Sequence, residues 1–235
     1  MKNKRLVLKL SGEILQGENA FGISDPVITE IAENIISLQE SGYEIGIVIG
    51  GGNFFRGAQK AAENMVRASA DNIGMLATLQ NSIALNDKFI QLGTDSVIFT
   101  SRKFGNIGRE FNHIEAKQAL SQKKIAIFAA GTGAPFFTTD TAAILRALEV
   151  EAGRVVKGTK VDGIYDKDPV KHPSAKFFPK ISYDKYLQLE LKVMDITAIS
   201  LAREYQLPIK IFNIKKKSNI VQAVKNEEFG SIISN

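Results

Sequence analysis

The sequence predicts an α/β protein built on a doubly wound, mostly parallel sheet with helices on both faces. Two observations lead to this fold class. Apolar runs of strand length alternate with amphipathic helical stretches almost to the end of the 235-residue chain, a pattern typical of parallel strands joined by crossover helices. No repeat, low-complexity tract or linker interrupts this alternation. We therefore expect a single domain that spans residues 1–235.

The strands are predicted from apolar runs that end in glycine or in polar residues. The first is residues 5–10, which Lys9 interrupts, and the second is residues 44–49, which ends at Gly50. Runs of similar length and composition follow at 96–100, 125–129, 154–156, 209–212 and 231–233. Their length and their aliphatic content favour buried strands.

The helices are predicted from apolar residues at helical spacing between these runs. Asp25-Pro26 begins the first helix, with an acidic cap before a proline, and Gly42 ends it. A long helical region spans 61–92, in which we expect Gly74 to mark a break. The other helical stretches are 112–121, 139–152, 183–191, 198–205 and 219–225. Thr139 or Asp140 is expected to cap the helix that begins there.

Composition narrows the class of protein. Hydrophobic residues make up 44% of the chain, and 30 basic against 25 acidic residues give a net charge of +5 that is spread along the sequence. This mild excess favours anionic ligands. The absence of cysteine excludes disulfides and thiolate metal sites, and the two histidines lack ligand partners at useful spacing. No run approaches the ~18 apolar residues of a membrane span. We expect a cytoplasmic protein without a membrane or nucleic-acid partner.

The stretch Gly50-Gly51-Gly52 at the end of the second apolar run is the most informative part of the sequence. Consecutive glycines bring bare backbone N–H groups close to a ligand, and phosphate is the usual occupant of such a loop. Ser11-Gly12 follows the strand that carries Lys9, and Arg56 can clamp phosphate oxygens with its planar guanidinium. These features predict a site that grips a polyphosphate from two sides. The alternatives are a tight turn without ligand and, for Lys9, an edge lysine that prevents aggregation.

A third glycine-containing loop occupies residues 131–140. Phe136 and Phe137 provide an apolar wall suited to a flat ring, and Thr138 and Thr139 can read its polar edge. We expect at least one of the two aromatic rings to belong to the core. The phosphate-binding signatures of P-loop proteins, dinucleotide-binding folds and protein kinases are all absent. The phosphate-binding machinery must therefore be of another type.

Four motifs together resemble the amino acid kinase superfamily: Lys9-Leu10-Ser11-Gly12, residues 48–53, residues 131–140 and residues 160–165. Within it, Pro135-Phe136-Phe137-Thr138-Thr139-Asp140 resembles the bacterial uridylate kinase branch, and the likeness covers essentially the whole chain. This resemblance implies transfer of the γ-phosphoryl group of Mg·ATP to UMP, giving UDP and ADP in pyrimidine synthesis. It also implies an acceptor-nucleotide part at roughly 1–150 and an ATP-binding part at roughly 151–235.

The resemblance further implies a role for each site residue. The catalytic residues are Lys9, Arg56 and Asp140. ATP is bound by Lys9, Leu10, Ser11, Gly12, Gly52, Arg56, Thr159, Tyr165 and Asp168. UMP is bound by Gly51, Asp71, Thr132, Gly133, Ala134, Pro135, Phe136, Phe137, Thr138 and Thr139. Asp140 orients Lys9 or holds magnesium through water, and Asp195 is a second candidate for that role. The Mg²⁺ cofactor is carried by ATP, and no protein metal site is expected.

The resemblance also implies a homohexamer that is inhibited by UTP. Residues 16–22 match a region tied to GTP activation, but Ala20 stands where glycine is common, which leaves the response to GTP open. Two other functions remain as alternatives. One keeps the fold with a carboxylate or carbamate acceptor, which the apolar Phe136-Phe137 loop disfavours. The other is a non-catalytic nucleotide-binding regulator or oxyanion store, against which Lys9, Arg56 and Asp140 argue.

Overall fold

The computed structural model describes residues 4–55, 64–216 and 218–235. Its strands are β1 (Arg5–Leu10), β2 (Glu44–Ile49), β3 (Ser96–Thr100), β4 (Arg109–Glu110), β5 (Ile125–Ala129), β6 (Arg154–Thr159), β7 (Ile164–Tyr165), β8 (Phe177–Phe178), β9 (Lys180–Ile181), β10 (Ile209–Asn213) and β11 (Ser231–Ile233). Its helices are α1 (Gly12–Leu15), α2 (Asp25–Glu40), α3 (Arg67–Gln91), α4 (His113–Ser121), α5 (Thr139–Glu149), α6 (Tyr183–Gln188), α7 (Ile196–Glu204) and α8 (Asn219–Lys225).

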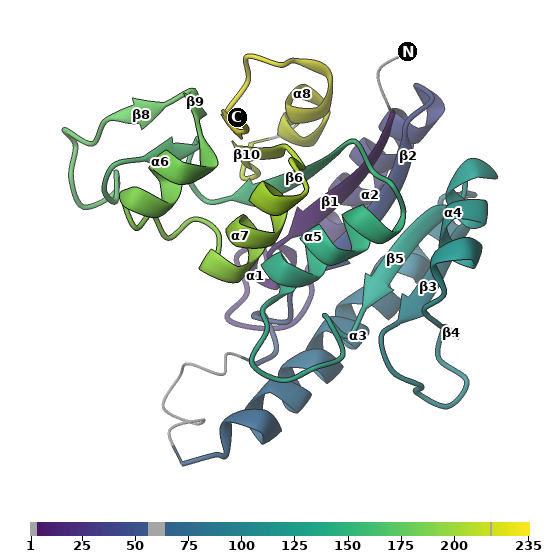
Figure 1. The fold of residues 1–235 in the computed structure, drawn as a ribbon. Coiled ribbons are helices and arrows are strands. Elements are labelled where there is room, and N and C mark those ends of the chain that lie inside the picture. The colour runs from purple at the N-terminus through teal and green to yellow at the C-terminus, as the bar shows by residue number, and fades with distance from the viewer. Residues whose placement is uncertain (1–3, 56–63, 217) are drawn as a thin grey trace.

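A nine-stranded sheet forms the centre of the described structure, in the order β4-β3-β5-β2-β1-β6-β10-β11-β9 (Figure 1). In this order, the seven strands from β4 at one edge to β10 all run parallel to their neighbours, whereas β11 is antiparallel to β10. Strands β7 and β8 form a separate antiparallel pair. The prediction of a mostly parallel sheet is confirmed, and β1 lies near its middle with β2 on one side and β6 on the other.

The core consists of two apolar layers, one on each face of the sheet. Side chains alternate along the strands, so that Val7 enters one layer while Leu6 and Leu8 enter the other. Helices α4, α5, α6 and α7 contribute to the first layer, and α1, α2, α3 and α8 contribute to the second (Figure 1). Lys9 shares the face of Val7, and its side chain therefore points toward α5.

Within the described residues the predicted strands and helices are present, with several boundaries shifted; residues 61–63 of the predicted 61–92 helix lie outside the described part, and α3 begins at Arg67. The expected break at Gly74 is wrong, because α3 continues through this residue from Arg67 to Gln91. Packing of α3 against β3 and β5 outweighs the cost of about 1 kcal/mol that a glycine adds to a helix interior. Helix α5 ends at Glu149 rather than at 152, and α6 ends at Gln188. Within the described residues, no helix has the length and apolar character that crossing a bilayer requires.

Candidate active site

Three buried charged side chains meet at the carboxyl end of β1. Lys9 and Lys157 are register partners on β1 and β6, and Asp140 projects from the first turn of α5. The Lys9 Nζ lies 2.8 Å from Asp140 Oδ1, and the Lys157 Nζ lies 2.5 Å from Asp140 Oδ2. Each of the three residues is only 8% exposed. One carboxylate therefore holds two ammonium groups at the point where two parallel strands end.

The electrostatics of this cluster follow from its burial. Burial by itself would raise the pKa of Asp140, but the charges of Lys9 and Lys157 hold this pKa below its ordinary value. Burial and the neighbouring charge of Lys9 lower the pKa of Lys157 to about 8, against the opposing effect of Asp140. When all three groups are ionised, the cluster carries one net positive charge, which suits a polyanionic ligand.

The start of α5 is fixed by Thr138 rather than by the predicted Thr139 or Asp140. The Thr138 hydroxyl accepts a hydrogen bond from the Asp140 backbone N–H at 3.0 Å, so Thr138 is the N-cap. Thr138 also donates to Asp195 Oδ2 at 2.5 Å, and Thr141 donates to the same carboxylate at 3.1 Å. Asp195 in turn caps α7 by accepting from the Ala198 N–H. This network ties α5, and with it Asp140, to α7.

The glycine loop after β2 makes backbone approaches that a side chain would block. A Cβ at Gly51 would lie 2.6 Å from Ala77 Cβ and 2.9 Å from the Gly74 carbonyl oxygen, both on α3. A Cβ at Gly12 would lie 2.4 Å from the Gly50 carbonyl oxygen. Glycine is therefore required at Gly12 and Gly51 by close packing, and the two glycine-bearing segments lie against each other.

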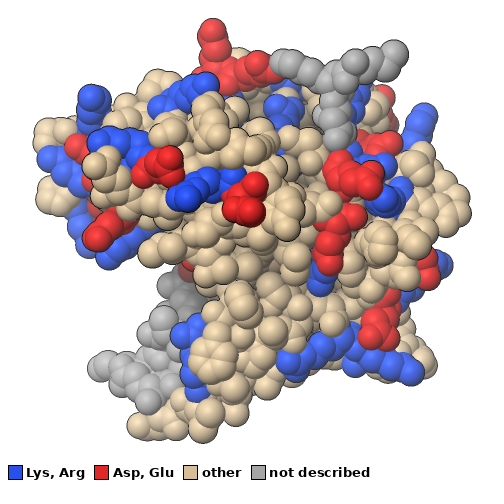
Figure 2. Space-filling view, viewed as in Figure 1, with Lys and Arg blue, Asp and Glu red and all other residues tan. Residues whose placement is uncertain are grey.

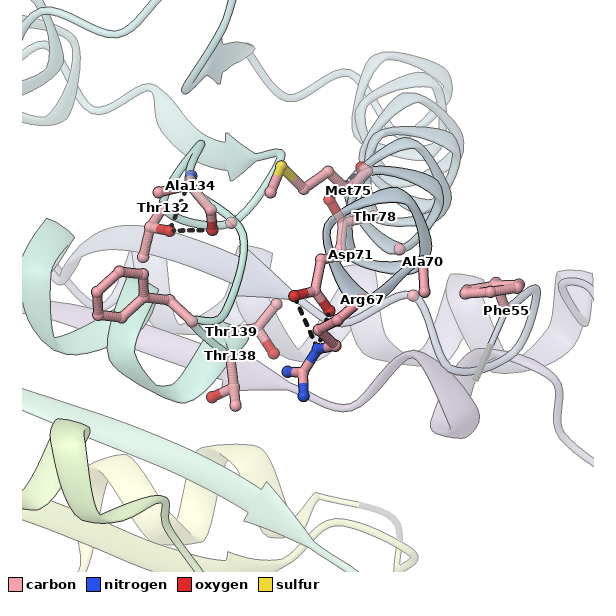
Figure 3. Close-up of a pocket in the computed structure, with 14 residues that line it drawn as sticks. Phe55, Arg67, Ala70, Asp71, Met75, Thr78, Thr132, Ala134, Thr138 and Thr139 are labelled. Atoms are coloured by element: carbon pink, nitrogen blue, oxygen red, sulfur yellow. Dashed lines mark hydrogen bonds and ion pairs between the residues drawn. The ribbon is translucent and has the colours of Figure 1, made fainter. Parts of the chain in front are cut away.

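A cavity of about 400 Å³ opens between α3 and the 131–139 loop. Figure 3 shows that Asp71 and Arg67 project from α3 into this cavity, opposite Thr132 and Ala134 of the loop. Asp71 accepts hydrogen bonds from Arg67 Nε at 2.9 Å and from the Phe136 backbone N–H at 2.7 Å. Asp71 thus joins the helix to the loop instead of lying on a solvated face.

Most of the predicted UMP-binding residues line this cavity: Gly51, Asp71, Thr132, Ala134, Phe137, Thr138 and Thr139. Gly133, Pro135 and Phe136 belong to the same loop but do not line it. The expectation that Phe136 or Phe137 belongs to the core is wrong, because they are 68% and 48% exposed. Both residues lie in the loop that borders the cavity: Phe136 adopts a φ of 72° and its ring packs against the Arg67 guanidinium, and Phe137 lines the cavity.

Two further cavities continue from the first. A cavity of about 590 Å³ shares Thr138 and Thr139 with the first and includes Lys9 and Asp140. A cavity of about 490 Å³ shares residues 190–192 with the second. On the face seen in Figure 2, a hollow separates the part that carries α6 and α7 from the lower end of α3. The cavities form a row with the Lys9–Asp140 pair in its middle portion.

The predicted ATP-binding residues are divided between cavities. Tyr165 and Asp168 line the third cavity of the row. Ser11 and Thr159 instead line a separate cavity of about 650 Å³ beside α1 and α2. The Leu10 side chain is buried in the core, and its carbonyl oxygen accepts from the Gly50 N–H. Gly12 begins α1 and Gly52 lies in the glycine loop after β2, and the predicted residue Arg56 lies outside the described residues.

Two residues of the site were missed by the sequence analysis. The predicted strand ends at residue 156 and leaves Lys157 without a role, although Lys157 lies within β6 and contacts Asp140. Its signal was a lysine directly after the apolar pair Val155-Val156 and before Gly158, which is weaker than the signal of Lys9 between two leucines. Arg67 lines the first cavity and forms an ion pair with Asp71, and its spacing of four residues from Asp71 on a helix could have revealed it.

The carboxylates at the centre are engaged by protein groups. Both Asp140 oxygens face lysines, and Asp195 accepts from two hydroxyls and a backbone N–H. In the described parts of the chain, no cluster of three or more acidic, histidine or cysteine side chains could hold a metal ion. Of the two roles considered for Asp140, the geometry favours orienting Lys9.

Comparison with known proteins gives a consistent result. The model of the amino acid kinase family matches residues 4–213. The uridylate kinase of Actinobacillus pleuropneumoniae is 44% identical over 231 residues, which cover 98% of each chain. The uridylate kinase of Psychromonas ingrahamii is 46% identical over 230 residues, or 98% of this chain and 92% of that one.

Solved structures agree with these sequence relatives. The UMP kinase from Bacillus anthracis superposes with a TM-score of 0.95 at 33% identity, covering 100% of this chain and 97% of that chain. The UMP kinase from Ureaplasma parvum gives a TM-score of 0.93 at 35% identity, with both chains fully covered. The similarity therefore extends along the whole chain and includes every element that lines the row of cavities.

Proposed function

The chain belongs to the amino acid kinase family, and we propose that it transfers the γ-phosphoryl group of ATP to UMP, forming UDP and ADP. The observation that carries this proposal is the position of Lys9. Its ammonium group is held by Asp140 in the second cavity of the row. This cavity adjoins the first cavity, which Asp71 lines (the Asp71 cavity), on one side and the third, which Tyr165 lines, on the other. Uridylate and UMP kinases are also among the relatives whose similarity covers 98–100% of the chain.

The proposed reaction uses alignment and charge rather than a covalent protein intermediate. The bond between the γ-phosphorus of ATP and the bridging oxygen of ADP breaks as a phosphate oxygen of UMP bonds to that phosphorus. Negative charge spreads over the transferring oxygens, and Lys9 is placed to neutralise it. Asp140 holds Lys9 in position, and Arg56 is proposed to clamp the phosphates. Magnesium enters with ATP and shields its phosphates.

The binding roles follow the cavities. We assign the Asp71 cavity to UMP. In this assignment Asp71 accepts hydrogen bonds from the ribose hydroxyls, the Gly51 N–H donates to the phosphate, and the 132–139 loop surrounds the uracil. We assign Gly12 and Gly52 to the ATP phosphates, and Thr159, Tyr165 and Asp168 to the adenine nucleotide. On this assignment the part up to about residue 150 binds mainly the acceptor, and 151–235 contributes most of the ATP side.

The assembly and the regulation of the protein are proposed from its family resemblance, and one exposed surface, on α3, supports the assembly. We propose a homohexamer inhibited by UTP. Helix α3 presents Leu76, Ile83 and Ile90 at seven-residue spacing, and these side chains are 48%, 40% and 59% exposed. An exposed apolar stripe along one helix is a feature of surfaces that pair with another chain. This stripe supports contact between copies.

A coupled assay of ADP release tests the function directly. The purified protein is supplied with Mg·ATP and, in turn, with UMP, CMP, N-acetylglutamate and carbamate. We expect turnover with UMP only, and none with CMP, N-acetylglutamate or carbamate. Turnover only with one of the last two acceptors would replace UMP by a different substrate class, and no turnover with any acceptor would favour the non-catalytic alternative.

A further inference from the structure

The side-chain amides of Asn53 and Asn81 form a reciprocal pair between the glycine loop and α3. Asn53 Nδ2 donates to Asn81 Oδ1 at 2.8 Å, and Asn81 Nδ2 donates to Asn53 Oδ1 at 2.7 Å. The two residues are 2% and 0% exposed. Because buried amides are costly when unpaired, this mutual arrangement leaves little freedom for either side chain.

The same two amides also hold backbone on both sides of the pair. Asn81 Nδ2 donates to the Gly50 carbonyl at 2.7 Å, and Asn53 Nδ2 donates to the Gly22 carbonyl at 2.8 Å. Gly12 lies directly against them, since a Cβ there would be 2.6 Å from Asn53 Oδ1. One buried amide pair therefore connects α3 with the glycine loop and with the segments that contain Gly12 and Gly22.

Helix α3 makes two more side-chain contacts of this kind along its length. The Thr78 hydroxyl accepts from the Ala130 N–H at 2.9 Å, and Asp71 accepts from the Phe136 N–H at 2.7 Å. Asn81, Thr78 and Asp71 are spaced by three and seven residues, so they share one side of the helix. The ten residues from Asp71 to Asn81 span about 15 Å at the α-helical rise. A single rigid helix thus sets the separation between Asp71 and the Gly50–Gly52 loop.

We propose that Asn53 and Asn81 are positioning residues that fix the phosphate-binding loop at a set distance from Asp71 and from Gly12. This inference rests on the proposed function, because it takes Gly51 and Gly52 to hold the phosphates of the two nucleotides. With Asp71 holding the ribose, the amide pair sets where the acceptor phosphate lies relative to the donor. Alignment of this kind is sensitive, since an error of about 1 Å can reduce a rate about 100-fold.

The test compares Asn81→Ala with Ser82→Ala. Ser82 is a matched control because it is also fully buried on α3, but its hydroxyl donates only to the Thr78 carbonyl of its own helix. The dissociation constants of UMP and of uridine are measured by calorimetry or ligand-observed NMR. Their ratio reports how much the phosphate adds to binding. Asn81→Ser serves as a milder second variant if Asn81→Ala does not fold.

We expect the ratio of the uridine constant to the UMP constant to fall at least about tenfold in the Asn81 variants, with kcat reduced by a similar or larger factor. The ratio should stay at the wild-type value in Ser82→Ala. A merely structural role would lower stability without changing this ratio, and an unchanged ratio in a folded Asn81 variant would overturn the proposal. Failure of the wild-type protein to bind or phosphorylate UMP would instead overturn the proposed function.

Discussion

Lys9 and Lys157 occupy paired positions on neighbouring parallel strands, and both ammonium groups contact the single carboxylate of Asp140. Two buried ammonium groups this close to one carboxylate would repel each other strongly if that carboxylate did not lie between them. Asp140 therefore positions Lys9 and, together with the Val193 carbonyl that also accepts from Lys157, positions Lys157. It also leaves a net positive charge where the proposed phosphoryl transfer takes place.

Asp140→Asn is expected to lower kcat at least about 100-fold, a range typical of lost electrostatic stabilisation. The thermal midpoint should also fall, because two buried ammonium groups lose their counter-ion. The rate is therefore measured at a temperature where circular dichroism shows the variant to be folded. Asp184→Asn is the matched control, since Asp184 pairs with Arg203 on the surface. Equal rates for the two folded variants would contradict the role of Asp140.

The pKa of about 8 for Lys157 predicts how activity responds to pH. Below this pH the Lys9–Asp140–Lys157 cluster carries one net positive charge, and above it the loss of a proton from Lys157 leaves the cluster neutral. We expect kcat/KM for UMP, which reports ionisations of the free enzyme, to fall as pH rises through about 8. In Lys157→Met, kcat/KM for UMP should be lower than in the wild type at every pH and should not fall as pH rises through about 8. A wild-type profile that is flat from pH 7 to 9 would contradict this assignment.

The same shift acts on stability with the opposite sign. The folded pKa of Lys157 lies below the unfolded value of about 10.4, so between these values the unfolded chain binds the extra proton. The free energy of unfolding of the wild type relative to Lys157→Met should therefore rise from pH 8 to about 10. Above that, Tyr183 and Tyr186, whose pKa values burial raises to about 12, destabilise both proteins alike. Chemical denaturation at several pH values measures the difference.

Much of the fold could be predicted because its strands are marked locally. The runs at 5–10, 44–49 and 125–129 are mostly aliphatic, with Lys9 as the only charged residue in their interior, and each is followed within two residues by glycine. Strands β4, β7, β8 and β9 were missed because each contains only two residues, which is too short for a periodic signal. Helix α1, with four residues, is also too short for a periodic signal and was missed. The wrong break at Gly74 arose because local propensity carries no information on the packing of α3.

The site was harder to predict, because its contacts join residues far apart in the sequence. Lys157 and Asp140 meet only through the register of β6 beside β1 and the position of α5 above them. Likewise, the asparagine after three glycines was visible, but its partner Asn81 lies 28 residues later inside a helix. Sequence motifs identified the loops that bear the site, whereas the side chains that hold those loops required the structure.

Asp71→Asn is expected to raise the KM for UMP by about 10- to 100-fold, because charge-assisted hydrogen bonds worth roughly 1.5–3 kcal/mol are lost. The KM for ATP should change much less, since Asp71 lies in the first cavity, away from Tyr165 and Asp168. Asp87→Asn on the same helix is the control, because Asp87 is exposed and accepts a hydrogen bond from Gln91 on the surface. Parallel increases in both KM values would argue against a specific role in binding UMP.

The exposed stripe on α3 gives a prediction about assembly. Ile83 lies in the middle of Leu76, Ile83 and Ile90, and a lysine there would place a charge inside any contact between two copies of this helix. Burying an unpaired charge costs more than such a contact gains from one isoleucine, roughly 1.5–3 kcal/mol. We expect Ile83→Lys to reduce the molar mass measured by light scattering, in steps that match whole subunits.

Ile114→Lys is the control, because Ile114 is 62% exposed on α4, on the opposite face of the sheet. If both variants keep the wild-type mass, the stripe does not join the copies, and if the wild type is itself a monomer, the proposed homohexamer is wrong.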